Sequence, residues 1–350
     1  MRRTRTAAIA AAATTAALAM ALAGCSSSGG TGTDASASSL EGTSITVYNA
    51  QHEELTQQWA DEFTAATGVE VVLRNGSDSE LANQIVQEGE ASPADVFLTE
   101  NSPAMSLVEG AGLFSPVDQA TLDQVPEQYR PSSGMWTGIA ARSTVFVYNT
   151  DLLTEAELPA SLNDLADPAW QGRWGASPGG ADFQAIVSAV LALEGESATE
   201  EWLAGMKSNA VAYQGNGAVM RAVNAGEIPG GVIYHYYWFA DQAGTKEGSA
   251  NTRLHFFGNE DPGAFVSVSG GGVLASSTEQ EAAQAFLAFI TSQQGQDVLR
   301  TGTSFEYTVG SGVPANPALP PLDTLQPPVI DPSTLNSTRV TELMTAAGLL

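Results

Sequence analysis

A strand–helix–strand–helix–strand rhythm in the first third of the chain restricts its possible folds more than any other feature. Short apolar runs that are typical of buried strands lie at residues 45–48, 69–73 and 94–98. Between the first two runs, Leu55, Trp59 and Phe63 recur at helical spacing. Strands joined by single helices run parallel, so we expect an α/β fold in which several loops share the carboxyl edge of one sheet.

The rest of the chain continues this mixture of elements. Helices are predicted at about residues 182–194, 199–207, 217–225 and 333–348, and another follows a capping pattern at residues 278–281. A second capping pattern lies at Ser77–Glu80. The apolar runs at 143–148 and 266–274 are candidate crossover strands, and a chain of 350 residues is long enough for two lobes with separate cores.

The N-terminus reads as an export signal. Arg2, Arg3 and Arg5 precede an Ala-rich apolar stretch that is too short and too early for a membrane span of the mature protein. The signal ends in Leu-Ala-Gly-Cys25, which resembles the lipobox of bacterial lipoproteins. We therefore expect residues 1–24 to be removed and Cys25 to carry lipid, with an ordinary secretory signal as the alternative. Residues 25–43, rich in Ser and Gly, form a flexible tether.

Composition excludes several classes of protein. Cys25 is the only cysteine, so disulfides, zinc ribbons, iron–sulfur clusters and cysteine nucleophiles are excluded. The formal charge of −26 argues against binding to nucleic acid or to anionic lipid. We expect contact with the membrane through the N-terminal lipid only.

The aromatic run Tyr234–Phe239 holds the main candidate for chemistry. Aromatic crowding is usually core packing. Adjacent phenols can also bind a ferric ion, because Fe3+ is a hard acid that prefers oxygen donors. Tyr236 and Tyr237 would point to opposite faces of a strand, whereas in the first turn of a helix both can reach one ion. A site here therefore requires the strand to end just before Tyr236.

Two further donors follow strands of the first lobe. His52 comes after the strand at 45–48 and Glu100 after the strand at 94–98, so both belong to the ligand-binding edge of the sheet. Two phenolates and one carboxylate balance the charge of Fe3+, and a neutral imidazole can complete a set of four protein ligands. Two positions then remain for water or a small anion.

A candidate anion site is formed by the turn that contains Gly180 and Ala181. This turn precedes a helix start, where free backbone N–H groups attract anions. Arg142 and Asn216 are candidates to assist in binding the anion.

The chain resembles the bacterial ferric-ion-binding substrate-binding proteins of ABC iron importers over residues 44–350. The resemblance is carried by ITVYNAQH at 45–52, ADVFLTE at 94–100, DPAWQGR at 167–173 and HYYW at 235–238. It implies a two-lobed periplasmic-binding-protein type II fold with interlobe crossovers and a ligand cleft. Residues 44–143 and about 267–318 would form lobe one, and about 144–266 and 319–350 lobe two.

The resemblance also implies a site and a role. His52 and Glu100 would bind Fe3+ from lobe one, and Tyr236 and Tyr237 from lobe two. Phosphate or carbonate would lie on Gly180 and Ala181 with Asn216 nearby. The protein would be a monomer on the outer face of the cytoplasmic membrane that delivers Fe3+ to an ABC permease. Gly179 and Tyr234 depart from the family pattern and leave the identity of the anion open.

Other functions remain as alternatives at this point. A receptor of the same fold for a phosphonate or a polyamine would use the aromatic cluster to hold its ligand. An enzyme is not expected, because the sequence has no His-Glu-x-x-His, no P-loop and no G-x-S-x-G elbow.

Overall fold

The structure is a computed structural model that describes residues 40–350. The expected signal peptide, Cys25 and most of the tether lie outside the described residues. In the described part, one sheet has the strand order β2-β1-β3-β10-β5-β8-β6-β7, with β4 paired to β10 and β9 paired to β5. The strands are β1 (Ser44–Asn49), β2 (Glu70–Asn75), β3 (Val96–Leu98), β4 (Phe114–Ser115), β5 (Thr137–Asn149), β6 (Trp174–Ala176), β7 (Ala210–Ala212), β8 (Gly230–Tyr234), β9 (Thr252–His255) and β10 (Val266–Leu274).

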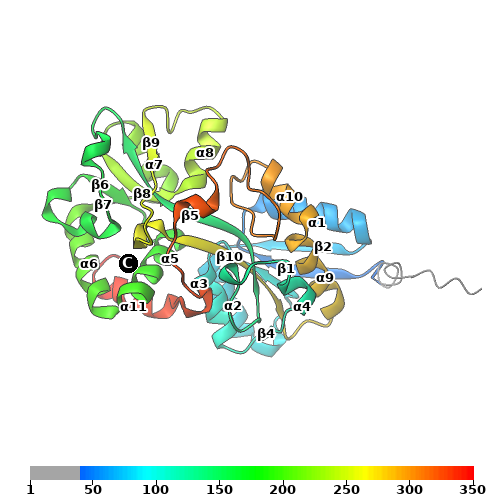
Figure 1. Cartoon of the computed structure of the whole chain (residues 1–350). Coiled ribbons are helices and arrows are strands. Elements are labelled where there is room, and N and C mark those ends of the chain that lie inside the picture. The colour runs from blue at the N-terminus through cyan, green and yellow to red at the C-terminus, as the bar shows by residue number, and fades with distance from the viewer. Residues whose placement is uncertain (1–39) are drawn as a thin grey trace, which may run out of the picture.

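The long strand β5 connects two lobes because its two halves pair with different neighbours. Its residues up to Ser143 pair with β10, whereas those from Thr144 onward pair with β8. Figure 1 shows one lobe around β1 and β2 and the other around β6 and β7, with β5 and β10 between them. The predicted two-lobed α/β fold and the crossover at residues 143–148 are confirmed.

Helices cover both faces of the sheet in each lobe. Those of the first lobe are α1 (Glu53–Thr67), α2 (Asp78–Glu88), α3 (Ser102–Gly110), α4 (Gln119–Leu122), α9 (Gln280–Thr291) and α10 (Gln293–Thr301). Those of the second are α5 (Ala181–Glu194), α6 (Glu196–Asn209), α7 (Asn216–Asn224) and α8 (His235–Ala243), and the chain ends with α11 (Ser337–Ala346). In the described part of the chain, none of these helices combines the length and the apolar character needed to cross a membrane.

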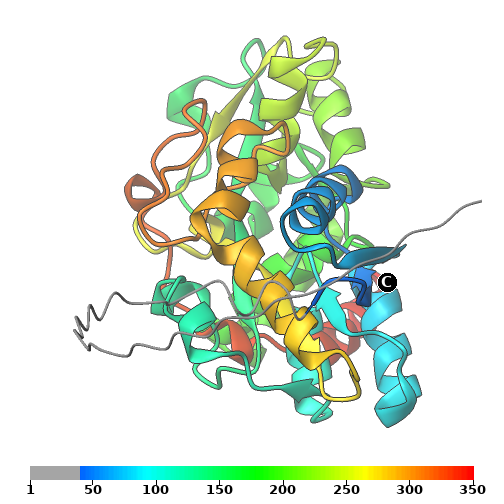
Figure 2. The same ribbon diagram turned by 90° about the vertical axis from the view of Figure 1, so that its right-hand side faces the viewer.

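Alternating apolar side chains on the strands explain why both faces are covered. On β1, Val47 packs with Trp59 and Phe63 of α1, whereas its neighbour Tyr48 packs with α2 and α3 on the opposite face. Figure 2 shows α9 and α10 following one another on the same side as α1. The buried positions at Leu55, Trp59 and Phe63 are those predicted for α1.

Helix starts agree with the sequence patterns in one place and differ in another. The Ser77 hydroxyl accepts the N–H of Glu80 and caps α2, as predicted. The cap predicted from the pattern at residues 278–281 is wrong. Glu279 is the N-cap residue of α9, and its side chain makes no capping hydrogen bond. The Ser277 hydroxyl instead accepts the N–H of Glu279 at 3.1 Å, so the local hydrogen bond forms in the turn before the helix.

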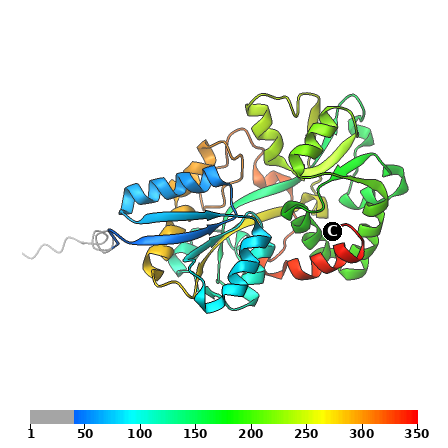
Figure 3. The same cartoon turned by 180° about the vertical axis from the view of Figure 1, so that it is seen from behind.

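The C-terminal helix contacts both lobes. It packs against α5 of the second lobe and also against α3 of the first, as the view from behind shows (Figure 3). Just before it, the carbonyl oxygen of Pro332 accepts the hydroxyl of Ser106 on α3 at 3.2 Å. The C-terminal segment therefore adds a link between the lobes besides β5 and β10.

Candidate metal centre

The loop after β1 brings His52 to the cleft between the lobes. Asn49 fixes this loop, because its Oδ1 accepts the N–H of Gln51 at 3.1 Å and the hydroxyl of Thr56 at 3.0 Å. Its amide group also donates to Asn75 on the neighbouring strand. His52 thereby becomes the N-cap residue of α1, with 31% of its side chain exposed.

The loop after β3 places Glu100 beside His52. Both the N–H of Glu100 and the N–H of Asn101 donate to the Asp78 carboxylate, at 2.9 and 3.0 Å. The carbonyl oxygen of Glu100 accepts the hydroxyl of Ser269 at 3.0 Å. With its backbone held in this way, Glu100 has its Oε1 3.6 Å from Nδ1 of His52. The two side chains that follow separate strands therefore lie together at one edge of the sheet.

The tyrosine pair enters from the second lobe. Strand β8 ends at Tyr234 and α8 begins at His235, so Tyr236 and Tyr237 lie in the first turn of the helix, as the predicted site requires. Their rings stack with centroids 4.4 Å apart. The Tyr236 ring also meets the His52 ring edge-on at 5.0 Å. The Tyr236 ring of one lobe thus reaches the imidazole of the other.

Asp182 is a residue of this cleft that the sequence reasoning missed. It lies in the first turn of α5, directly after Ala181, and is 6% exposed. Its Oδ2 accepts the amide of Asn216 at 2.6 Å and the hydroxyl of Tyr236 at 3.3 Å, and its Oδ1 accepts the amide of Asn101 at 3.0 Å. Asp182 could have been found from the sequence by its position, because it lies in the first turn of the helix at which the anion was expected.

Glu306 is the second residue that was missed. Its side chain is fully buried and forms an ion pair with Arg142. It also lies 2.9 Å from Nε2 of His52 and accepts the amide of Gln51 at 3.1 Å. Glu306 follows α10 in a loop without a recognisable motif, so only the folded chain brings it to the site.

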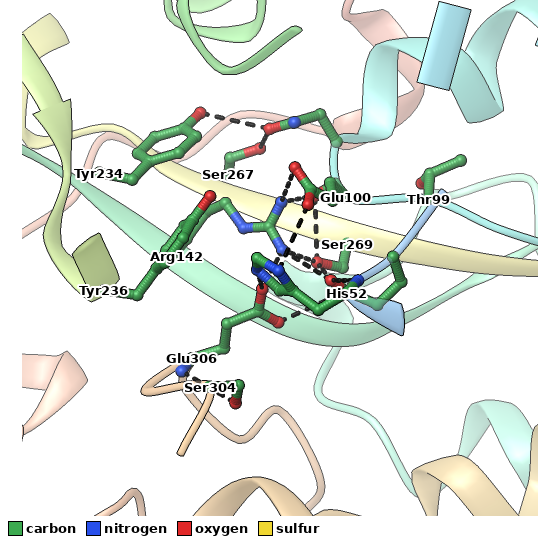
Figure 4. A network of polar contacts seen from close by, with 12 residues as sticks. His52, Thr99, Glu100, Arg142, Tyr234, Tyr236, Ser267, Ser269, Ser304 and Glu306 are labelled. Carbon is green, nitrogen blue, oxygen red and sulfur yellow. Dashed lines mark hydrogen bonds and ion pairs between the residues drawn. The ribbon is translucent and has the colours of Figure 1, made fainter. Parts of the chain in front are cut away.

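The residues expected to bind an anion are mostly engaged by protein groups. The buried guanidinium of Arg142 donates to the carbonyl oxygen of Glu100 at 2.5 Å and to Ser269 at 2.9 Å, in addition to Glu306. Figure 4 shows Arg142 between His52, Glu100 and Glu306, with Tyr236 on its other side. Gly180 is the N-cap residue of α5, and Ala181 lines a cavity of about 540 Å³ that also borders Asn101.

Burial shifts the protonation of the site. It raises the pKa of Tyr236 well above its ordinary value and that of Tyr237 to about 12, so both phenols are protonated at neutral pH. Burial likewise raises the pKa of Glu100 to about 7, against the opposing effect of Arg142. Burial alone would lower the pKa of His52, but the negative charge of Glu306, 2.9 Å from Nε2, is the main effect that raises it.

An open cavity adjoins the candidate ligands. Its volume is about 540 Å³, and it is lined by His52, Tyr236, Tyr237 and the segment 302–304, among others. Within residues 40–350, no group of three or more His, Cys, Asp or Glu side chains is arranged to hold a metal ion. The candidate ligands differ from such a group, because two of the four are the phenols of Tyr236 and Tyr237.

The other two histidines have structural contacts. His235 is fully buried, its Nδ1 accepts the N–H of Ser143 at 3.1 Å, and its ring stacks on Tyr307. His255 lies 3.0 Å from the carbonyl oxygen of Pro159. His52 is thus the histidine that the fold brings to the phenols.

Polar side chains of two α/β lobes that face one another across a cleft define a two-lobed binding protein. A sequence profile described as bacterial extracellular solute-binding protein matches residues 91–329. The Fe(3+)-binding periplasmic protein of Serratia marcescens is 64% identical, over 87% of this chain and 90% of that protein. The major ferric iron-binding protein of Neisseria meningitidis serogroup B is 37% identical, over 87% of this chain and 93% of its own length.

Solved structures agree with these relatives. Iron-bound HitA from Pseudomonas aeruginosa is 40% identical with a TM-score of 0.81, over 88% of this chain and 100% of that one. The Trichodesmium protein IdiA (FutA), in complex with iron and citrate, is 26% identical with a TM-score of 0.77, over 88% and 100%. The chain belongs to the bacterial extracellular solute-binding protein family, in its branch of ferric-ion-binding proteins. These are solute-binding proteins and not enzymes, which confirms the prediction that the chain is not an enzyme.

Proposed function

We propose that this chain binds Fe3+ in the cleft between its lobes. The observation that carries the proposal is the meeting of Tyr236 and Tyr237 with His52 and Glu100, two candidate ligands from each lobe. Phenolate and carboxylate are hard donors that suit a ferric ion, and imidazole is a common metal ligand. The ferric-ion binding named for the Serratia and Neisseria relatives supports the same cargo.

The Asp182 carboxylate takes the place of a separate anion in this proposal. Its oxygen atoms lie within hydrogen-bonding distance of Tyr236, Asn101 and Asn216, at the helix start where phosphate or carbonate was expected. Two phenolates together with Glu100, Asp182 and the buried Glu306 carry five negative charges, against four positive charges on the ion and Arg142. An added phosphate or carbonate would increase the repulsion, so water is the better ligand for the remaining positions on the ion.

Delivery completes the proposed role. The protein is a monomer that is held on the outer face of the cytoplasmic membrane by lipid on Cys25, and it passes Fe3+ to an ABC permease. The solute-binding family supports the permease as partner, and the Leu-Ala-Gly-Cys25 sequence supports the anchor. Cys25→Ser should move the protein from the membrane fraction to the soluble extracytoplasmic fraction. A variant that stays in the membrane fraction would contradict the anchor.

A titration with ferric citrate tests the iron proposal. We expect one iron per chain and a red to purple tyrosinate-to-iron charge-transfer band in the purified protein. Absence of both colour and iron, by elemental analysis, would contradict the proposal. If such a protein were instead stabilised against heat by a phosphonate or by putrescine, the organic-solute alternative would hold.

A further inference from the structure

Glu306 occupies a position that the proposed ligand set does not explain. Its carboxylate is fully buried behind His52 and contacts three polar side chains: Arg142, His52 and Gln51. A buried carboxylate is costly unless it is paired and hydrogen bonded. Each partner of Glu306 belongs to the candidate site or adjoins it: Gln51 precedes His52, and Arg142 donates to the carbonyl oxygen of Glu100. The free-energy cost of burying this carboxylate is therefore linked to the site.

The backbone around Glu306 holds the carboxylate in place. Tyr307 and Ala141 exchange two backbone hydrogen bonds, at 2.8 and 3.0 Å, which fix the loop against β5 next to Arg142. Phe305 has φ of 55°, a left-handed conformation that is unusual for a bulky residue. Such strain persists only where the surroundings enforce it, and it is common at functional sites. The strained turn at Phe305 directs the next side chain inward.

The contacts of the His52 ring distinguish its two nitrogen atoms. Nε2 lies 2.9 Å from Oε1 of Glu306, on the inner side of the site. Nδ1 faces the other way, 3.6 Å from Oε1 of Glu100. Histidines that bind metals usually donate their second N–H to a carboxylate or a carbonyl, which fixes the tautomer and the ring orientation.

We propose that Glu306 is a positioning residue that holds the Nε2–H of His52, so that Nδ1 is the nitrogen that binds Fe3+. This inference rests on the proposed function. Arg142 anchors the same carboxylate from the other side, and Gln51 holds its second oxygen. Glu306 therefore acts on the ion through His52, and its negative charge favours Fe3+ over Fe2+ in the site.

A charge-removing variant gives the first test. Glu306→Gln keeps the shape of the side chain, and we expect Fe3+ affinity to fall roughly 10- to 100-fold, as is typical for loss of a partner that orients a ligand. The reduction potential of the bound iron should move to a more positive value, a change that a purely structural role would not produce. Glu109→Gln is the matched control, because the Glu109 carboxylate accepts the indole N–H of Trp136 and not a group of the candidate site. Unchanged affinity and potential in Glu306→Gln would overturn the inference.

A measurement on the unmodified protein remains informative if that variant does not fold. Ga3+ replaces Fe3+ as a diamagnetic probe in protein labelled with 15N-histidine, and the three histidines of the chain are assigned by difference. We expect His52 to keep its proton on Nε2 while Nδ1 shifts on metal binding. A shift at Nε2 with the proton on Nδ1, or an unshifted His52 in metal-loaded protein, would overturn the inference about Glu306 but leave the proposed iron binding intact. Protein that binds neither Ga3+ nor Fe3+ would overturn the proposed function itself.

Discussion

At the scale of single side chains, the proposed iron site depends most on Tyr236 and Tyr237. Replacing either by Phe removes one oxygen ligand but keeps the stacked rings, so the fold should survive. We expect each variant to lose more than about 100-fold in Fe3+ affinity, beyond what loss of an orienting partner costs. The double variant should also lose the charge-transfer band. Tyr213→Phe is the control, because Tyr213 packs against the apolar cluster of Val219 and Ile228. Tight iron binding by the double variant would refute the assignment.

The affinity for Fe3+ should depend on pH, because the same two tyrosines must release protons when they bind the ion. Burial raises the pKa of Tyr237 to about 12 and that of Tyr236 well above its ordinary value, so in the proposed site iron must displace a proton from each phenol at neutral pH. Each displaced proton makes affinity fall about tenfold per unit decrease in pH. Glu100, with its pKa raised by burial to about 7, adds a further proton in more acidic solution. Competition with a chelator of known pH dependence measures this slope, and affinity independent of pH would contradict it.

The residues that line the candidate site could be predicted from the sequence only where a motif marked them. His52 and Glu100 follow recognisable strands, and two adjacent tyrosines are conspicuous in any sequence. Asp182 was hidden because an acidic residue in the first turn of a helix is ordinary capping chemistry. Glu306 follows no pattern at all, and its role arises from contacts with Arg142 and His52 that are distant in sequence.

At the scale of elements, the contact between β8 and α7 positions the helix that carries the tyrosines. A Cβ on Gly231 would lie 2.3 Å from Cγ1 of Val219 and 3.0 Å from the carbonyl oxygen of Gly175. Gly231→Ala should therefore lower the free energy of unfolding by about 1–3 kcal/mol, as overpacking does. Urea denaturation checks this value. Gly110→Ala, where a Cβ meets nothing within 4 Å, should leave stability nearly unchanged, and equal stability of both variants would contradict the packing argument.

Local sequence patterns were sufficient to predict whether a segment is a helix or a strand. They did not give the residue at which a helix begins, because that depends on hydrogen bonds formed in the folded chain. The apolar spacing of Leu55, Trp59 and Phe63 was sufficient to predict α1, because these side chains pack on the sheet. The start of α9 was mispredicted, because the Ser277 hydroxyl bonds the N–H of Glu279 in place of the expected cap. The change from strand to helix after Tyr234 was predicted as a condition of the expected iron site and not from any propensity of the residues.

At the scale of the whole molecule, Asn101 connects the lobes without any ligand. Its amide donates to Asp182 at 3.0 Å and its Oδ1 accepts the hydroxyl of Tyr234 at 3.4 Å, both from the second lobe. Asn101→Ala removes both hydrogen bonds, each worth about 0.5–1.5 kcal/mol. We expect the iron-free protein to open and Fe3+ affinity to fall roughly tenfold, because less of the closed form is populated.

Small-angle X-ray scattering measures this opening directly. The iron-free Asn101→Ala variant should have a larger radius of gyration than the iron-free wild type, and iron should reduce the difference. Asn83→Ala is the control, because the exposed amide of Asn83 donates only to Ser79 within α2. Equal radii and equal affinities would show that Asn101 does not hold the lobes together.

The position of the metal in the iron-loaded protein shows most directly whether Fe3+ binds at the tyrosine pair. Anomalous scattering at the iron edge in a crystal should give one strong peak between the hydroxyl oxygens of Tyr236 and Tyr237, within bonding distance of His52 and Glu100. The Asp182 carboxylate should lie beside the hydroxyl oxygen of Tyr236. A peak outside the cleft, or one that touches neither phenol, would contradict the proposal that this chain carries Fe3+ between its lobes on the tyrosine pair.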